Sequence, residues 1–242
     1  MPRDYLLLDL YSGAGGAGAG YARAGFRVVG VDSRPMPRYP FEFHQADALE
    51  VLDALAATGE WRGLRFDAIH ASPPCRDHSK LAALRGTVGT GWLLAATRER
   101  LERTGRPWVI ENVPGAPMRA DFRLCGCLLD LPRLPDGRRL RRERWFETNW
   151  HATGTAARCK HPGRAVTVAG HPGGTSRRDG PAASFADWQA AMDVDWMSCR
   201  ELAQAIPPAY TEFIGRHLMA VVQETEAPGQ ADRVLSSQAG AD

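Results

Sequence analysis

The sequence predicts an α/β fold in which helices cover a mostly parallel β-sheet. Three observations indicate this fold. Short apolar runs alternate with segments of helical composition, a glycine-rich loop follows the first apolar run, and polar residues stand directly after several of the runs. Strands that alternate with helices are joined by right-handed crossovers and therefore pair in parallel. Because ligands bind at the carboxyl ends of the strands in such sheets, we expect the functional site at that edge.

Four apolar runs are expected to be buried parallel strands, since strands covered on both faces have continuous apolar sequence. These runs are residues 5–10, 26–31, 66–71 and 107–113. Helical composition predicts the covering helices at residues 17–24, 46–57, 92–103, 200–205 and 210–223. The regular pattern is therefore interrupted once, between the last strand and the last two helices.

This interruption predicts the domain organisation. After residue 148, glycine, proline, arginine and histidine dominate, and only residues 165–169 have the composition of a short strand. We expect residues 1–148 to form the main domain, 149–190 a small loop-rich insert and 191–223 a segment that returns to the main domain. Residues 224–242 lack apolar periodicity and are expected to be disordered.

Composition and charge leave the function open. With 242 residues, of which 44% are hydrophobic, the chain can bury a core, and its formal net charge of +2 does not by itself indicate a nucleic-acid-binding protein. Lys80 and Lys160 are the only lysines, so arginine carries nearly all of the positive charge. Arginine suits bidentate phosphate and base contacts, although a GC-rich genome would produce the same bias.

The sequence also bears on location and on the cysteines. The sequence has no apolar run long enough to span a membrane and no signal-peptide pattern. We therefore expect a cytoplasmic protein without a membrane partner. The five cysteines are irregularly spaced, which does not predict a disulfide framework. Cys125 and Cys127, together with Cys159 and His161, can form a zinc site, but the apolar surroundings of Cys125 favour a core position. We therefore expect no bound metal.

The glycine-rich loop predicts a nucleoside-containing cofactor. Gly13, Gly15 and Gly18 form a GxGxxG pattern between the first strand and the first helix, where glycine permits close backbone approach to a ligand. Asp32 ends the second strand about 20 residues later, where a carboxylate can accept from ribose hydroxyls. Asp47 either accepts from an adenine amino group or caps the next helix. The loop alone fits NAD as well as S-adenosylmethionine.

Five short segments follow one another in a definite order between residues 5 and 222. They are Asp9-Leu10-Tyr11-Ser12-Gly13-Ala14-Gly15-Gly16, Pro73-Pro74-Cys75 with Ser79, Glu111-Asn112-Val113, Arg142-Glu143-Arg144, and Gln204-Ala205-Ile206-Pro207-Pro208 with Ile214-Gly215. In this order they resemble the signatures of the DNA cytosine-5 methyltransferases. The resemblance implies a Rossmann-like, S-adenosylmethionine-dependent methyltransferase fold, with S-adenosylmethionine as cofactor, double-stranded DNA as partner and the insert as a target-recognition element.

The resemblance also implies the chemistry of the site. Cys75 would attack carbon 6 of a flipped-out cytosine, which makes carbon 5 nucleophilic. Glu111 would hydrogen-bond or protonate ring nitrogen 3, and burial at the end of its strand is expected to raise its pKa. Arg144 would hold the carbonyl oxygen of the base, while Arg142 would brace the loop or bind a phosphate.

Further residues take roles through the same resemblance. The predicted cofactor-binding residues are Asp9, Tyr11, Ser12, Gly13, Ala14, Gly15, Gly16, Asp32, Ser33, Asp47, Ala48 and Pro73. The predicted substrate-binding residues are Arg76, Ser79 and Asn112. A monomer is expected, with a partner protein as an alternative source of specificity.

The chain departs from the family pattern in places. Leu140 stands where the arginine motif usually begins with glutamine, and Arg76 replaces the glutamine that usually follows the cysteine. The insert is short, which is typical of compact phage-encoded or actinobacterial members and predicts a short target sequence. Three other classes stay open: an NAD-dependent oxidoreductase, a non-catalytic DNA-binding relative, and a methyltransferase that acts on RNA or nucleotides.

Overall fold

The computed structural model describes most of the chain. The described residues are 3–74, 91–129, 131–151, 159, 163–170, 172–173 and 182–226. Cys75, Arg76, Ser79 and His161 lie outside them, so what the sequence predicts for these side chains stays a prediction.

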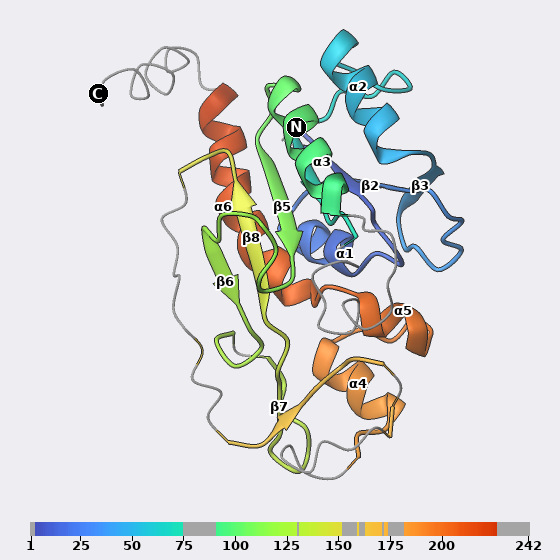
Figure 1. Ribbon diagram of the computed structural model, residues 1–242, viewed down its shortest axis with the longest axis vertical. Helices are drawn as coiled ribbons and strands as arrows, with labels where there is room; N and C mark the ends of the chain where they lie inside the picture. Colours follow the sequence, from blue (N-terminus) through green and yellow to red (C-terminus); the bar gives the residue numbers. More distant parts are fainter. Residues whose placement is uncertain are drawn as a thin grey trace.

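A seven-stranded sheet forms the centre of the molecule (Figure 1). In spatial order its strands are β3 (Glu42–Gln45), β2 (Arg27–Asp32), β1 (Leu6–Leu10), β4 (Ala68–Ala71), β5 (Trp108–Asn112), β8 (Arg144–Thr148) and β6 (Phe122–Leu124). The neighbours from β3 to β5 are parallel, whereas β8 is antiparallel to both of its neighbours. The dinucleotide-binding fold has the order 3-2-1-4-5-6 in a mostly parallel sheet, so the inserted antiparallel strand distinguishes this sheet from it.

The four predicted parallel strands are confirmed as β1, β2, β4 and β5. The prediction missed β3, β6 and β8, because these strands are short or carry polar residues among apolar ones. β3 is an edge strand without a fully buried residue. β8 contains the buried Glu147, whose charge is paired with Arg98 at 2.8 Å. A strand that contains such a buried charged residue is not recognised as an apolar run in the sequence.

Helices cover both faces of the sheet, which confirms the predicted layers (Figure 1). They are α1 (Gly16–Arg23) and α6 (Pro208–Glu226), which share one apolar core, and α2 (Ala48–Thr58) and α3 (Gly91–Arg103), which share a second. Side chains of β1 alternate between the cores, so that Leu7 belongs to the first and Leu8 to the second. Among the described helices, none combines the length and the apolar composition that crossing a membrane requires.

The C-terminal helix α6 lies directly against α1. A Cβ atom at Gly20 would lie 2.1 Å from the backbone oxygen of Pro208, so only glycine permits this approach. The hydroxyl of Thr211 donates to the backbone oxygen of Ala17 at 2.8 Å. The last described element, α6, therefore belongs to the same helical layer as α1.

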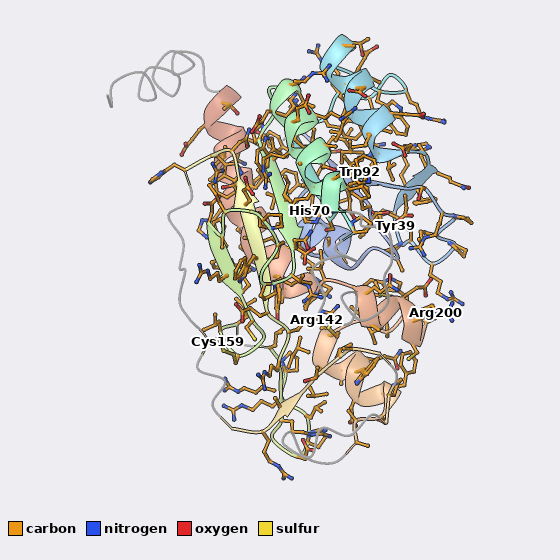
Figure 2. The ribbon with its side chains drawn as sticks, viewed as in Figure 1. Tyr39, His70, Trp92, Arg142, Cys159 and Arg200 are labelled. Atoms are coloured by element: carbon orange, nitrogen blue, oxygen red, sulfur yellow. A yellow bond between two sulfur atoms is a disulfide. The ribbon has the colours of Figure 1, made fainter. Side chains whose placement is uncertain are left out.

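The small elements of the second half of the chain lie beyond the carboxyl ends of the parallel strands (Figure 1). There β7 (Arg139–Leu140) pairs in parallel with β9 (Ala165–Val166), which confirms the short strand expected in the insert. The helices α4 (Phe185–Met192) and α5 (Cys199–Gln204) follow. Arg142 lies at the junction between this part and the sheet (Figure 2).

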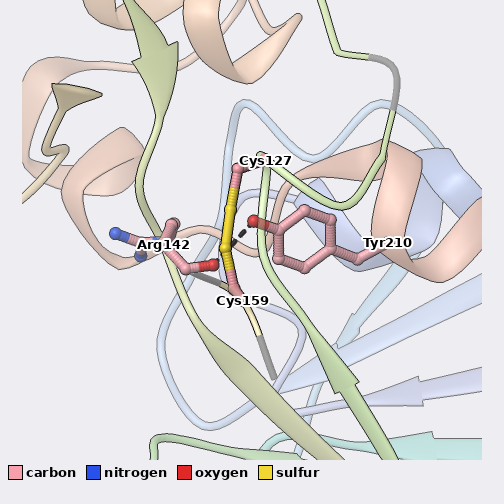
Figure 3. Close-up of a disulfide and its surroundings, with 4 residues drawn as sticks. All are labelled: Cys127, Arg142, Cys159 and Tyr210. Carbon is pink, nitrogen blue, oxygen red and sulfur yellow. Dashed lines mark hydrogen bonds between the residues drawn. A yellow bond between two sulfur atoms is a disulfide. The ribbon is translucent and has the colours of Figure 1, made fainter. Parts of the chain in front are cut away.

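Three expectations for the second half of the chain are wrong. The loop-rich character ends before residue 190, because Ser184 caps α4 and this helix crosses the expected boundary. Residues 224–226 are helical rather than disordered, because α6 continues to Glu226. A disulfide does form, between Cys127 after β6 and Cys159 in the insert (Figure 3). The spacing of the cysteines does not predict this bond, because the fold brings together two segments that are distant in sequence.

Candidate active site

A cavity of about 620 Å³ opens at the carboxyl ends of the central strands. Its wall includes Tyr11 after β1, Asp32 at the end of β2, Pro73 after β4 and Glu111 in β5. Residues 203–206, at the end of α5 and just beyond it, also line it. The cavity therefore connects the glycine-rich loop with the Pro-Pro loop and with the Glu-Asn-Val segment.

The glycine-rich loop is held by the end of β2. The Gly13 amide donates to Oδ2 of Asp32 at 3.1 Å, and the Arg34 amide donates to Oδ1 at 3.0 Å. Gly15 has a φ of 87°, and a Cβ atom there would approach Pro40 to 2.6 Å. Glycine is therefore required at this turn, as the sequence pattern predicts.

A buried carboxyl group lies at the start of this loop. Asp9 is fully buried in β1, and burial raises its pKa to about 7. Tyr39 donates to its Oδ2 atom at 3.0 Å, whereas its Oδ1 atom meets no hydrogen-bond donor among the described residues. Asp9 is also among the residues that line the cavity, although its side chain is fully buried.

Glu111 and Arg144 form an ion pair in the wall of the cavity. Nε of Arg144 lies 2.8 Å from Oε1 of Glu111. The two residues meet because β8 runs antiparallel to β5, with Phe146 opposite Glu111. Burial raises the pKa of Glu111, in the direction expected from the sequence, and the charge of Arg144 opposes this shift. The pair presents a carboxyl group that can hold a proton beside a permanent positive charge.

Arg142 connects several segments of the chain through hydrogen bonds. Its guanidinium group donates to the backbone oxygens of Val168 and Ala203. Its own backbone oxygen accepts from the hydroxyl of Tyr210, 2.6 Å away (Figure 3). These contacts join the segment after β9 to α5 and α6, and Arg142 is not among the described residues that line the cavity. Of the two roles expected for it, the contacts favour bracing over phosphate binding.

Asn112 connects the end of β5 with the Pro-Pro loop. Its side-chain nitrogen donates to the backbone oxygen of Pro73 at 3.0 Å, and its side-chain oxygen accepts from the Val113 amide at 2.9 Å. Cys75 follows Pro73 by two positions in the sequence. Asn112 lines the cavity and also fixes the start of the loop that leads to Cys75.

A series of buried hydrogen bonds reaches Glu111 from inside the protein. Oη of Tyr21 lies 2.9 Å from Nδ1 of His70, and Nε2 of His70 lies 2.8 Å from Oγ of Ser72. Ser72 in turn hydrogen-bonds Glu111. Burial lowers the pKa of His70 to about 3, so its imidazole is neutral at physiological pH. The sequence analysis missed this series, although a histidine inside an apolar strand was a signal for it.

The structure brings most of the predicted cofactor residues to the cavity. Those that line it are Asp9, Tyr11, Ser12, Gly13, Ala14, Gly16, Asp32, Ser33 and Pro73. Gly15 and Ala48 are not among the described lining residues, and neither is Asp47. Asp47 caps α2, where its carboxylate accepts from two backbone amides at 2.8 and 3.2 Å. Its contacts thus match the helix cap rather than the adenine contact.

Two aromatic residues that the sequence analysis missed support the glycine-rich loop. The indole nitrogen of Trp196 donates to the backbone oxygen of Ala14 at 2.9 Å. Tyr39 lies so close to Gly15 and Gly30 that Cβ atoms there would meet its ring at 3.1 and 2.3 Å. The contacts of Trp196 with Ala14 and of Tyr39 with Gly15 join segments that are far apart in sequence, so no local pattern reveals them.

Fold and site together define a class of protein. A sheet of order 3-2-1-4-5 followed by an antiparallel strand, with a glycine-rich loop after β1 and an acid at the end of β2, has the architecture of S-adenosylmethionine-dependent methyltransferases. This confirms the predicted fold class.

Three solved structures of methyltransferases resemble the fold of this protein. The Dnmt2 methyltransferase of S. pombe is 12% identical, with a TM-score of 0.58 over 90% of this chain and 99% of that chain. An E. coli prophage-encoded protein assigned as a DNA modification methyltransferase is 14% identical, with a TM-score of 0.56 over 91% and 100%. The Entamoeba histolytica methyltransferase EhMeth is 9% identical, with a TM-score of 0.50 over 91% and 99%. No family model and no curated protein matches the sequence. At these identities, the likeness establishes the fold.

Proposed function

We propose that this protein is an S-adenosylmethionine-dependent methyltransferase that methylates carbon 5 of cytosine in DNA, with Cys75 as the nucleophile at carbon 6. The observation that carries the proposal is the cavity that joins the glycine-rich loop to Glu111, Arg144 and the loop preceding Cys75. A methyl donor and an acceptor base must meet in one space, and the two ends of this cavity offer a surface suited to each.

The end formed by β1 and β2 suits a positively charged nucleoside. Asp9 provides a buried oxygen that meets no donor among the described residues, and the carboxylate of Asp32 suits ribose hydroxyls. The loop glycines let the backbone approach the ligand closely. When bound, S-adenosylmethionine supplies an electrophilic methyl group. The order of the sheet argues against the alternative of an NAD-dependent oxidoreductase.

The end formed by β4, β5 and β8 suits a cytosine ring. Addition of the Cys75 thiolate to carbon 6 pushes an electron pair into the ring, and a proton delivered to nitrogen 3 neutralises it. Glu111 is suited to donate this proton, because burial raises its pKa. Arg144, 2.8 Å from Glu111, is suited to hold the carbonyl oxygen of the base. Carbon 5 then takes the methyl group, which leaves S-adenosylhomocysteine, and Glu111 takes back the proton from nitrogen 3. Loss of the carbon 5 proton to water then expels the Cys75 thiolate.

Duplex DNA is the proposed substrate, and the target cytosine must leave the base stack to enter the cavity. One structural neighbour is assigned as a DNA modification methyltransferase, which is consistent with a DNA substrate. Arg141 and Arg164 are exposed beside the β7–β9 pair, beyond the carboxyl ends of the strands, and suit phosphate contacts. The chain is proposed to act as a monomer.

The direct test supplies the full chain with tritium-labelled S-adenosylmethionine and duplex DNA, followed by nucleoside analysis. We expect label in 5-methylcytosine, with RNA and free nucleotides as parallel substrates and Cys75→Ser as the inactive control. Label that enters RNA alone, or another base, contradicts the proposal. In a separate arm, S-adenosylhomocysteine should raise the melting temperature and NADH should not.

The short insert predicts a short target. Each bidentate base contact contributes roughly 1–3 kcal/mol of discrimination, and a long site needs several of them. We expect a target of about two to four base pairs and strongly salt-dependent affinity from phosphate contacts. Bisulfite sequencing of plasmid DNA methylated by the purified chain measures the target. A strict site of about six or more base pairs would refute the small recognition element.

A further inference from the structure

Three cysteines converge outside the proposed active site. Cys125 and Cys127 belong to the segment that follows β6, and Cys159 comes from the insert, 32 positions after Cys127. The three Sγ atoms all lie within 4.8 Å of one another. Cys125 is buried and the other two are half-buried. None of them is among the described residues that line the cavity, so the cluster needs a role of its own.

A disulfide accounts for only two of these sulfur atoms. Cys127 and Cys159 are bonded to each other, and their Cα atoms are 6.9 Å apart, at the outer edge of the roughly 4.4–6.8 Å range usual for disulfides (Figure 3). Cys125 stands within reach of both partners. Thiolates that bind one zinc ion tetrahedrally lie about 2.3 Å from the metal, hence nearly 4 Å from each other. Once the Cys127–Cys159 bond is broken, these two sulfur atoms must move apart from bonding distance to reach that arrangement, whereas Cys125 already lies within 4.8 Å of both.

The surroundings of the cluster suit a structural link. Tyr210 and the backbone oxygen of Arg142, which are joined by a hydrogen bond of 2.6 Å, lie beside the disulfide (Figure 3). The insert that carries Cys159 has only the two residues of β9 in strand conformation within its described part before α4 begins. Segments with so little regular structure are commonly stabilised by a metal or a covalent link.

We propose that, in the reduced protein, Cys125, Cys127 and Cys159 bind a zinc ion that anchors the insert to the strand β6. Reduction of the Cys127–Cys159 bond by a thiol or phosphine takes up two electrons and two protons and gives two thiols. Zinc binding then displaces the thiol protons. His161, two positions after Cys159, lies outside the described residues, and the proposal rests on the three cysteines alone. It departs from the absence of metal expected from the sequence.

The first experiment uses the unaltered full chain. Protein reduced with a phosphine is incubated with zinc sulfate, desalted without oxygen and analysed for metal. We expect about one zinc ion per chain. Alkylation in the native state, read by mass spectrometry, should show that zinc protects Cys125, Cys127 and Cys159 while Cys199 stays as reactive as without metal. Absence of retained zinc, or the same alkylation pattern with and without it, overturns the proposal.

A second experiment tests whether Cys125 binds the metal together with Cys127 and Cys159. Cobalt(II) replaces zinc, and its charge-transfer absorption reports thiolate coordination. Cys125→Ser is the decisive variant, because it leaves both disulfide-forming cysteines in place. We expect it to weaken cobalt binding by at least about tenfold and to reduce the charge-transfer band, whereas Cys199→Ser should behave as the unaltered chain. Circular dichroism checks that each variant folds. A folded Cys125→Ser protein with undiminished cobalt binding overturns the assignment of Cys125.

Discussion

The two ends of the cavity are assembled in different ways. The end formed by β1 and β2 draws most of its surface from a short stretch of chain, with Asp9 and the glycine-rich loop in one segment and Asp32 at the close of the next strand. The opposite end combines β4, β5 and β8. There Glu111 and Arg144 meet only because two strands that are distant in sequence pair in antiparallel fashion.

This difference predicts how substitutions at the two ends behave. The end formed by β1 and β2 is proposed to bind the cofactor through the glycine-rich loop and the strand ends beside it. Substitutions there should therefore alter the affinity for the cofactor. The second end aligns charged groups by long-range pairing, so changes there should alter turnover. Four substitutions test this separation, in order of decreasing expected effect.

Cys75→Ala should abolish turnover and leave S-adenosylmethionine binding nearly unchanged, because the thiolate forms the bond to the base and no described cofactor contact depends on it. Methyl transfer to DNA measures the first effect and titration calorimetry the second. Substantial activity in this variant would sink the assignment of Cys75 as nucleophile.

Glu111→Gln should slow methyl transfer by at least about a hundredfold, because an amide donates a hydrogen bond but delivers no proton. Glu111 acts in its protonated form, and burial raises its pKa, so the rate should fall as the pH rises through this raised pKa. This alkaline limb should vanish in the variant. A loss of less than about threefold would demote Glu111 to a structural role.

Asp32→Ala should weaken S-adenosylmethionine binding by about tenfold and leave the choice of DNA unchanged, since charged hydrogen bonds are worth roughly 1.5–3 kcal/mol. Asp53→Ala, which removes a carboxylate that pairs with Arg100 on the helical surface, is the matched control. Unchanged cofactor affinity in Asp32→Ala would show that the end of β2 does not contact the cofactor.

Ser72→Ala should have the smallest effect, a loss of a few-fold in rate and a shift of the alkaline limb to higher pH. The hydrogen bond from Ser72 stabilises the charged form of Glu111, so its removal raises the pKa of Glu111 further. Combining it with Glu111→Gln should abolish the shift. A shift that persists in the double variant would mean that another group titrates.

The same contrast explains what the sequence could predict. The four parallel strands, the glycine-rich turn and the buried Glu111 follow from apolar runs and from what stands at their ends. Strand β8 could not be found in this way, because its buried Glu147 depends on Arg98 in α3 for its pairing. The contact from Ser72 to Glu111 and the position of Tyr39 against Gly30 depend on neighbouring elements in space. The Cys127–Cys159 bond was missed for the same reason.

The contact between α6 and α1 has a consequence for how the molecule is made. The residues that meet there, Ala17 and Thr211, are separated by 194 positions. While the chain is being synthesised, the side of α1 that packs against α6 has no cover until α6 has emerged from the ribosome. Contacts of such long range are slow to form and leave apolar surface exposed in the meantime. The nascent protein therefore depends on its own C-terminal helix to become resistant to aggregation and proteolysis.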